Sequence, residues 1–263
     1  MKPFLCLAVL VALMGAFMSP ATAAAPRKIL VVTATQGYRH SAIEVAESVI
    51  ASLGKSSGLY EVELATATPA SDTDPAAYRE QVRAMLARQL DAAALKRYDG
   101  IVFALTTGEL PLPDNEALIR WVKEGGAFVG VHSASDTLHG YRPYIDMLGG
   151  EFDHHREQVT IQGINRDASH PANRHLPAAW DLEGQKEEIY LFKNYQREAV
   201  HELIVLDRHP NTGEAGHFPI SWCRDFGRGR VFYTALGHNE QVWQMPAFRQ
   251  HLLGGIAWAL KLQ

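Results

Sequence analysis

Residues 125–136 read GGAFVGVHSASD, and Phe128–Val131 is a short apolar run that predicts a buried strand. The chain then turns through His132, Ser133 and Ala134 before a weak helical pattern that starts near Leu138. A strand that enters a tight turn ahead of a helix presents one side chain at the carboxyl edge of an α/β sheet. His132 occupies the middle of this turn, where an imidazole suits a base or a metal ligand.

The segments around this stretch alternate between apolar runs and helical patterns. The sequence predicts strands over 28–35, 61–66, 100–105 and 128–131, and helices over 41–54, 74–97 and 113–125. After Gly150 short strands follow one another, and the chain ends on an amphipathic helix over 246–262. These later strands, expected to form an antiparallel extension, cover 157–163, 188–192, 203–206, 220–223 and 229–236. The pattern predicts an α/β fold with a doubly wound, mostly parallel sheet.

Composition places the chain among ordinary globular proteins. It has 263 residues, of which 47% are hydrophobic and 21% charged, with a formal net charge of −4. No basic excess favours nucleic acid, so we expect no nucleic-acid partner.

The first 23 residues have the features of a secretory signal peptide. Lys2 precedes an apolar run over 4–18, and Ala21-Thr22-Ala23 forms a small-residue cleavage site. The alternative is a membrane anchor, for which the apolar run is short. We therefore expect export to the periplasm or medium, cleavage near Ala23, one domain over 24–263 and no membrane contact after cleavage. Cleavage would remove Cys6 and leave Cys223 without a disulfide partner.

Several of the 12 histidines stand where expected strands end. His40 lies in the first strand-to-helix loop, His132 at the turn described above, and His238 directly after the strand over 229–236. Loops at the carboxyl ends of neighbouring parallel strands meet in one crevice, so these three imidazoles are expected to converge. Each of them alone is equally consistent with an exposed side chain or a hydrogen bond to the backbone.

Four runs of sequence, over 126–134, 219–223, 229–238 and 248–258, resemble the ThuA-like (trehalose-utilisation) family. The resemblance extends over nearly the whole chain from Lys28 to Leu260. It implies the class I glutamine amidotransferase-like fold, a flavodoxin-like α/β sandwich. Amidotransferases of that superfamily carry a catalytic cysteine in a Gly-x-Cys-x-Gly turn and a later His-x-Glu.

Here Gly130 to Ala134 matches the turn with His132 in place of the cysteine, and His238-Asn239-Glu240 matches the later motif. The nucleophile is missing while its partner remains, so glutamine hydrolysis is not expected. Two facing imidazoles suit a shared proton path or a divalent metal. Cys223 lies inside an expected strand and is interpreted as a buried thiol. No nucleotide cofactor is expected.

The resemblance also implies a substrate class, because ThuA-like proteins are linked with disaccharide catabolism through 3-keto glycosides. A carbonyl at C3 acidifies the proton at C2, so a base could remove it with a lyase, hydrolase or isomerase outcome. The catalytic candidates are His132, His238, Glu240 and Asp136. The substrate-binding candidates are His40, Tyr38, Asp153, His154, Glu188, Tyr190 and His217.

A metal, if bound, would be held by His132, His238 and His40. Imidazole with carboxylate favours Zn, Mn, Co or Ni over Ca or Mg. The segment at Glu188 and Tyr190 suits hydroxyl binding and stacking under a sugar ring, although an outward strand face would have the same pattern.

Other functions are open at this stage. One alternative is a sugar-binding or accessory protein without catalysis, and a second is a hydrolase with Ser133 as nucleophile and His238 as base. The sequence does not decide whether the chain forms a homo-oligomer.

Overall fold

The computed structural model describes residues 25–262, so the expected signal segment lies outside the described residues. The helices are α1 (Ile43–Ser57), α2 (Pro75–Leu90), α3 (Asn115–Lys123), α4 (Arg142–Leu148), α5 (Glu240–Gln244) and α6 (Pro246–Ala259). Short 3-10 helices are η1 (Ala94–Arg97), η2 (His132–Asp136), η3 (Leu182–Gly184) and η4 (Arg197–Ala199). The first strands are β1 (Arg27–Val32), β2 (Tyr60–Ala65), β3 (Gly100–Ala104), β4 (Ala127–Val131), β5 (Glu151–His154) and β6 (Gly163–Asn165). The later strands are β7 (Ala179–Trp180), β8 (Leu191–Lys193), β9 (His201–Arg208), β10 (Ala215–Phe226) and β11 (Gly229–Thr234).

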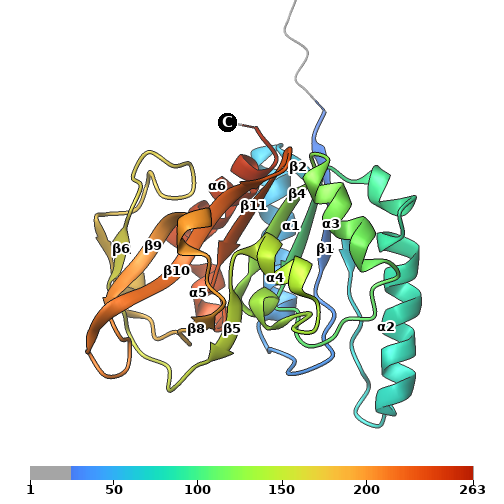
Figure 1. The fold of residues 1–263 in the computed structure, drawn as a ribbon, viewed down its shortest axis with the longest axis horizontal. Helices are drawn as coiled ribbons and strands as arrows, with labels where there is room; N and C mark the ends of the chain where they lie inside the picture. Colours follow the sequence, from blue (N-terminus) through green and yellow to red (C-terminus); the bar gives the residue numbers. More distant parts are fainter. Residues whose placement is uncertain (1–24, 263) are drawn as a thin grey trace, which may run out of the picture.

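One large sheet runs through the molecule in the order β2-β1-β3-β4-β11-β10-β9-β6-β7 (Figure 1). The pairs from β2 to β11 are parallel, and those from β11 to β7 are antiparallel. Strand β11 belongs to both parts, because it pairs with β4 on one side and with β10 on the other. The prediction of a doubly wound α/β sheet with an antiparallel extension is confirmed.

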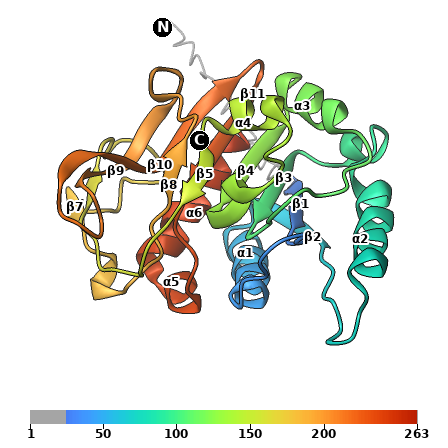
Figure 2. The same cartoon turned by 60° about the horizontal axis from the view of Figure 1, so that its bottom comes forward.

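Alternate side chains of the parallel strands enter two separate cores, one on each face of the sheet. Val31, Val129 and Phe232 pack with α1, α5 and α6, whereas Phe103 and Phe128 pack with α2, α3 and α4. Figure 2 shows the two helical layers enclosing the parallel strands. Strands buried on both faces explain the continuous apolar runs in the sequence.

Two expected elements differ from the structure. The helix predicted over 74–97 ends at Leu90, because the Asp91 side chain accepts hydrogen bonds from the N–H groups of Ala93 and Ala94 and begins η1 instead. The helix expected near Leu138 begins only at Arg142, and η2 fills the turn after β4.

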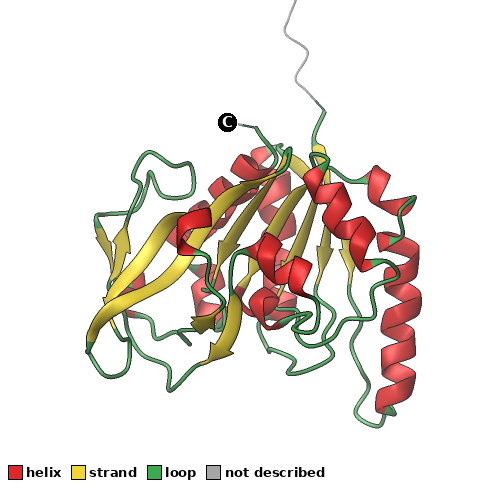
Figure 3. Cartoon of the chain, viewed as in Figure 1, coloured by secondary structure: helices red, strands yellow, loops and turns green. Residues whose placement is uncertain are grey.

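The strand expected over 188–192 is not part of the main sheet. Strand β8 pairs with β5 in a separate two-stranded sheet at the carboxyl edge of the parallel strands (Figure 3). The reason lies just before it, where Glu187 pairs its backbone with Val159 and turns its carboxylate toward the end of β11. The segment over 157–163 likewise contributes this bridge at Val159, and only its last residue, Gly163, belongs to β6.

Among residues 25–262, no helix has the length and apolar character needed to cross a membrane.

Candidate metal centre

Three imidazoles and one carboxylate converge at the carboxyl ends of the parallel strands. His40 follows β1, His132 follows β4, His238 follows β11, and Glu188 precedes β8. One ligand atom from each lies within 4.8 Å of every other. The ring centroids of His40 lie 4.8 Å from those of His132 and 5.2 Å from those of His238. The structure therefore brings together the three histidines predicted as metal ligands, and it adds Glu188, which the sequence placed among substrate-binding residues.

His132 is fixed at the turn by its backbone and its ring. Its φ of 51° lies in the left-handed region, which is uncommon for a residue other than glycine. The carbonyl oxygen of His132 accepts a hydrogen bond from the Tyr233 hydroxyl at 2.7 Å. Two residues earlier, a Cβ on Gly130 would lie 2.9 Å from the Tyr233 ring, so only glycine allows this close approach. His132 therefore occupies the strained position in the middle of the turn after β4, where the sequence analysis placed a base or a metal ligand.

The His132 ring has a defined tautomer. Its Nδ1–H donates to the carbonyl oxygen of Ala235 at 2.7 Å, so its Nε2 carries a lone pair. That Nε2 atom lies 3.7 Å from Glu188 Oε1. Complete burial and the neighbouring His40 lower the pKa of His132 well below its usual value, which keeps the ring neutral. A neutral imidazole with its other nitrogen bonded to a backbone carbonyl is the form that binds metals.

His40 lies on a loop that the β3 side of the sheet holds in place. Thr107 accepts a hydrogen bond from the Gly37 N–H and donates one to the Tyr38 carbonyl oxygen at 2.8 Å. Burial, followed by the charge of His238, lowers the pKa of His40 to about 4. At neutral pH this second imidazole is therefore uncharged as well.

His238 is held by a buried carboxylate that the sequence did not single out. Glu187 accepts hydrogen bonds from the backbone N–H groups of Gly237 and His238, and Gly237 has a φ of 112° that suits glycine. Burial raises the pKa of Glu187 to about 7. Burial alone would lower the pKa of His238, but the Glu188 carboxylate raises it above its usual value.

The cluster contains two imidazole nitrogens that lack a hydrogen-bond partner of suitable geometry within residues 25–262. His132 Nε2 and His238 Nδ1 are buried and have no hydrogen-bond partner among the described residues. Glu188 Oε1 lies 3.3 Å from the latter atom. Buried polar atoms are rarely left unpartnered, because such an atom costs about 1–3 kcal/mol. A cation between them would satisfy all of these atoms, so the residues present fit a divalent metal. The ligand atoms that lie farthest apart, within 4.8 Å, would then move slightly closer together.

Aromatic side chains and a further histidine surround the cluster. The ring of Tyr190 packs 4.4 Å from that of His132 and is 3% exposed, so it supports the metal ligands and offers no open face for a sugar. Tyr38 is 67% exposed, and its ring lies 4.8 Å from that of His40. His155, on the loop after β5, places its Nδ1 3.3 Å from Glu188 Oε2. The open aromatic surface beside the cluster is therefore Tyr38.

Asp136 belongs to a second polar group near the cluster. His139 donates from Nε2 to Asp136 Oδ1 at 2.8 Å and from Nδ1 to Glu151 Oε1 at 2.6 Å. The charge of Asp136 reaches the cluster, where it raises the pKa of His40 against the larger effect of burial. The sequence named Asp136 but neither of its partners.

The remaining sequence candidates lie apart from the four ligands. Glu240 begins α5, and its side chain makes no hydrogen bond or ion pair within residues 25–262. His154 pairs with Asp153 at 2.8 Å, and His217 pairs with Glu202 on β9 at 2.6 Å. The carboxylate that meets His132 and His238 is thus Glu188.

Two side chains with nucleophilic groups, Ser133 and Cys223, have defined surroundings in the structure. Ser133 Oγ lies 3.5 Å from His40 Nδ1, and no hydrogen bond joins it to His238 in the described part of the chain. Cys223 is buried in β10, where burial raises the pKa of its thiol to about 12. This geometry gives Ser133 a different imidazole partner from the one that the hydrolase alternative requires.

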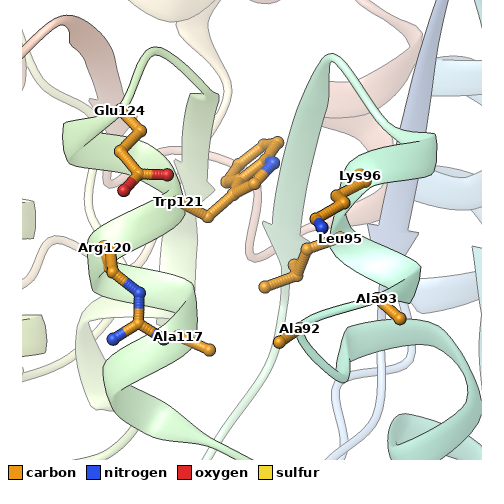
Figure 4. A pocket seen from close by; sticks show the side chains of 8 residues that line it. All are labelled: Ala92, Ala93, Leu95, Lys96, Ala117, Arg120, Trp121 and Glu124. Atoms are coloured by element: carbon orange, nitrogen blue, oxygen red, sulfur yellow. The ribbon is translucent and has the colours of Figure 1, made fainter.

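A surface hollow of about 380 Å³ lies on the opposite edge of the sheet, between η1 and α3 (Figure 4). Its lining consists of Ala92, Ala93, Leu95, Lys96, Ala117, Arg120, Trp121 and Glu124. These residues precede β3 and β4, whereas the histidines follow the strands. The hollow therefore has no part in the histidine cluster.

Comparison with known proteins places this chain in a family. The profile of the ThuA family, described as trehalose utilisation, matches residues 28–259. Crystal structures of ThuA-like proteins from Parabacteroides merdae and Bacteroides uniformis superpose with TM-scores of 0.68 and 0.66, each at 19% identity. The first covers 90% of this chain and 91% of its own, and the second covers 92% and 95%. A carbohydrate deacetylase superposes with a TM-score of 0.51 at 15% identity, over 90% of this chain and 32% of its own. No curated protein matches the chain.

Proposed function

Because this chain belongs to the ThuA (trehalose utilisation) family, we propose that it is a carbohydrate-active enzyme built around a divalent transition metal. The observation that carries the proposal is the convergence of His40, His132, His238 and Glu188 with unpartnered buried nitrogens. The family description and the carbohydrate deacetylase among the structural neighbours support a carbohydrate as substrate.

We propose a 3-keto glycoside as the substrate and removal of the C2 proton as the first step. The metal would be held by the three imidazoles and Glu188, and when bound it would supply a Lewis acid for a carbonyl oxygen. Three histidines with one carboxylate favour Zn, Mn, Co or Ni. The exposed Tyr38 and His155 and the partly exposed Asp136 are groups at the rim of this centre that a sugar would meet.

The expected setting is outside the cytoplasm. The sequence of residues 1–23 supports export and cleavage near Ala23, after which the chain would work in the periplasm or medium without a membrane. We propose a small-molecule carbohydrate, and no nucleic acid, as its partner.

The deciding experiment starts with metal analysis of the purified protein. We expect about one transition-metal ion per chain, because the four ligand atoms lie within 4.8 Å of one another and surround a single position. The His132→Ala variant should lose this ion. The control is His201→Ala, which removes a histidine of β9 that pairs with Asp167, and this variant should retain the ion. Wild-type protein that holds no metal after incubation with Zn²⁺, Mn²⁺, Co²⁺ or Ni²⁺ would contradict the metal centre.

The same preparations then test the reaction. Incubation with 3-keto-trehalose in D2O should exchange the C2 proton for deuterium, and a chelator should abolish the exchange. A sugar that binds in calorimetry but is recovered without deuterium and without cleavage would identify a binding protein instead.

A further inference from the structure

His139 and its two carboxylate partners form a hydrogen-bonded group that contributes no ligand to the proposed metal centre. His139 lies between two carboxylates from different elements, Asp136 at the end of η2 and Glu151 on β5. Its two ring nitrogens lie 2.8 Å and 2.6 Å from their oxygens. A carboxylate only accepts hydrogen bonds when ionised, so both nitrogens donate and the ring is an imidazolium.

Both oxygens of the Glu151 carboxylate have polar partners. Glu151 is 5% exposed, and its Oε2 accepts a hydrogen bond from Asn194 Nδ2 at 2.6 Å. Lys193 places its ammonium 3.3 Å from the Oε1 atom that His139 also contacts. Glu151 therefore has no free oxygen for a substrate and serves to hold the imidazolium.

The Asp136 carboxylate is hydrogen-bonded through one of its two oxygens within residues 25–262. Asp136 Oδ1 accepts the His139 bond, while no hydrogen bond to Oδ2 occurs in the described part of the chain. The Asp136 side chain is 28% exposed, and its charge acts on His40 and Tyr190. A partly exposed carboxylate oxygen thus lies at the end of the short helix η2 that begins with the ligand His132. The hydrogen bond from the His139 imidazolium fixes the orientation of this carboxylate.

We propose that Asp136 is the base that removes the C2 proton and that His139, held by Glu151, is its positioning residue. This assignment rests on the proposed function, since it needs a carbon acid as substrate. The C2–H bond breaks and its proton forms an O–H bond with Asp136 Oδ2, while its electron pair forms the C2–C3 double bond and the carbonyl π pair moves to the C3 oxygen, giving an enediolate. In an isomerisation the proton returns to C3, and the C2 hydroxyl proton passes to the C3 oxygen as the C2 carbonyl forms. In an elimination the C3 carbonyl re-forms, the C2–C3 pair becomes a C1–C2 double bond, the C1–O bond breaks, and the proton from Asp136 goes to the departing oxygen.

The arrangement predicts a pH dependence with a defined sign. Hydrogen bonding to Asp136, partly offset by burial, raises the pKa of His139, and Glu151 adds to the increase. The other charged groups facing this loop are Lys193 on β8 and Glu109, which accepts a hydrogen bond from the Gly140 N–H. The imidazolium is present below the usual histidine pKa of about 6.5 and is lost only as pH rises through the raised value. Exchange should therefore fall on the alkaline side at that pH.

The test measures C2 deuterium exchange of 3-keto-trehalose with the metal-loaded protein. Asp136→Asn should lower the exchange rate by about 10²- to 10⁴-fold. His139→Gln should lower it by about tenfold or more, remove the alkaline fall, and leave the KM little changed, with metal content equal to wild type. Added imidazole should restore part of the exchange in His139→Ala.

Independent measurements keep the two proposals distinguishable. In the wild-type protein without substrate, NMR of the His139 ring should show both N–H groups at pH 6. A wild-type protein that exchanges the proton, with His139→Gln equally fast and unchanged in pH profile, would overturn the role of His139. A His139→Gln variant that loses its metal as well would reveal a structural role only. Absence of exchange in the wild type would instead contradict the proposed reaction.

Discussion

The left-handed backbone conformation of His132 directs its ring toward the proposed metal centre. Its φ of 51° costs about 1–2 kcal/mol relative to an ordinary conformation. The hydrogen bonds from Tyr233 to its carbonyl and from its Nδ1–H to Ala235 hold this conformation. In return the ring lies wholly inside the protein with Nε2 toward Glu188. The cost of the turn is thus compensated by packing and hydrogen bonds around it.

At the same scale, His155 is expected to strengthen metal binding. Its Nδ1–H faces both the Arg156 carbonyl oxygen at 3.0 Å and Glu188 Oε2 at 3.3 Å, so it stabilises the carboxylate on the side away from the metal ligands. His155→Ala should weaken Zn²⁺ affinity by about tenfold in calorimetry, because groups behind a ligand orient it. The neighbouring His154→Ala is the control, since His154 pairs with Asp153 and forms no hydrogen bond or ion pair with the four ligands within residues 25–262. Equal affinities for the wild type and His155→Ala would refute this contribution.

At the scale of elements, β5, β8 and their flanking loops close the site from one side. They carry Glu188, Tyr190 and His155, and the Glu151–His139 bond joins β5 to the turn after β4. The antiparallel part of the chain therefore contributes to the centre a carboxylate that the parallel strands lack.

Helix α6 depends on its glycine pair for contact with the sheet. A Cβ on Gly255 would overlap the ring of Phe232 on β11, and one on Gly254 would overlap the backbone at Pro171. Gly255→Ala should lower the free energy of unfolding by about 1–3 kcal/mol, because overpacking outweighs the gain in helix propensity of about 1 kcal/mol.

Urea unfolding of this variant measures the effect. Ala51→Gly, at a partly exposed position of α1, is the control for propensity and should cost only about 1 kcal/mol. A Gly255→Ala protein more stable than wild type would show that α6 can move away from β11 without loss.

At the scale of the whole molecule, the four ligands join distant parts of the chain. They follow β1, β4 and β11 and precede β8, so one ion would bind only the folded arrangement. Binding at about 100 times Kd adds about 2.7 kcal/mol to the stability of the folded state. For a chain of this size each kcal/mol corresponds to about 2–4 °C, so Zn²⁺ should raise the Tm by about 5–10 °C.

Calorimetry in the presence and absence of a chelator checks this shift. His132→Ala should show no increase with Zn²⁺, although its own Tm is lower because a buried ring is removed. A Zn²⁺-dependent increase that persists in His132→Ala would place the ion elsewhere on the molecule.

The sequence by itself determined the class of fold and the three histidines. Apolar runs that alternate with helical patterns required a sheet covered on both faces, and residues that directly follow parallel strands must meet at one edge. His40, His132 and His238 could therefore be brought together without coordinates. Local features, such as the glycine two residues before His132, act over a few residues and can therefore be recognised in the sequence.

Only the tertiary structure decided which carboxylates join them. The sequence placed Glu240 among the catalytic candidates and Glu188 among the substrate-binding ones. In the structure the backbone pairing of Glu187 with Val159 brings Glu188 to His238. His139 likewise gains its meaning from Glu151, which reaches it through the pairing of β5 with β8. Such contacts depend on strand pairing and side-chain direction between segments far apart in the chain, and no local pattern encodes them.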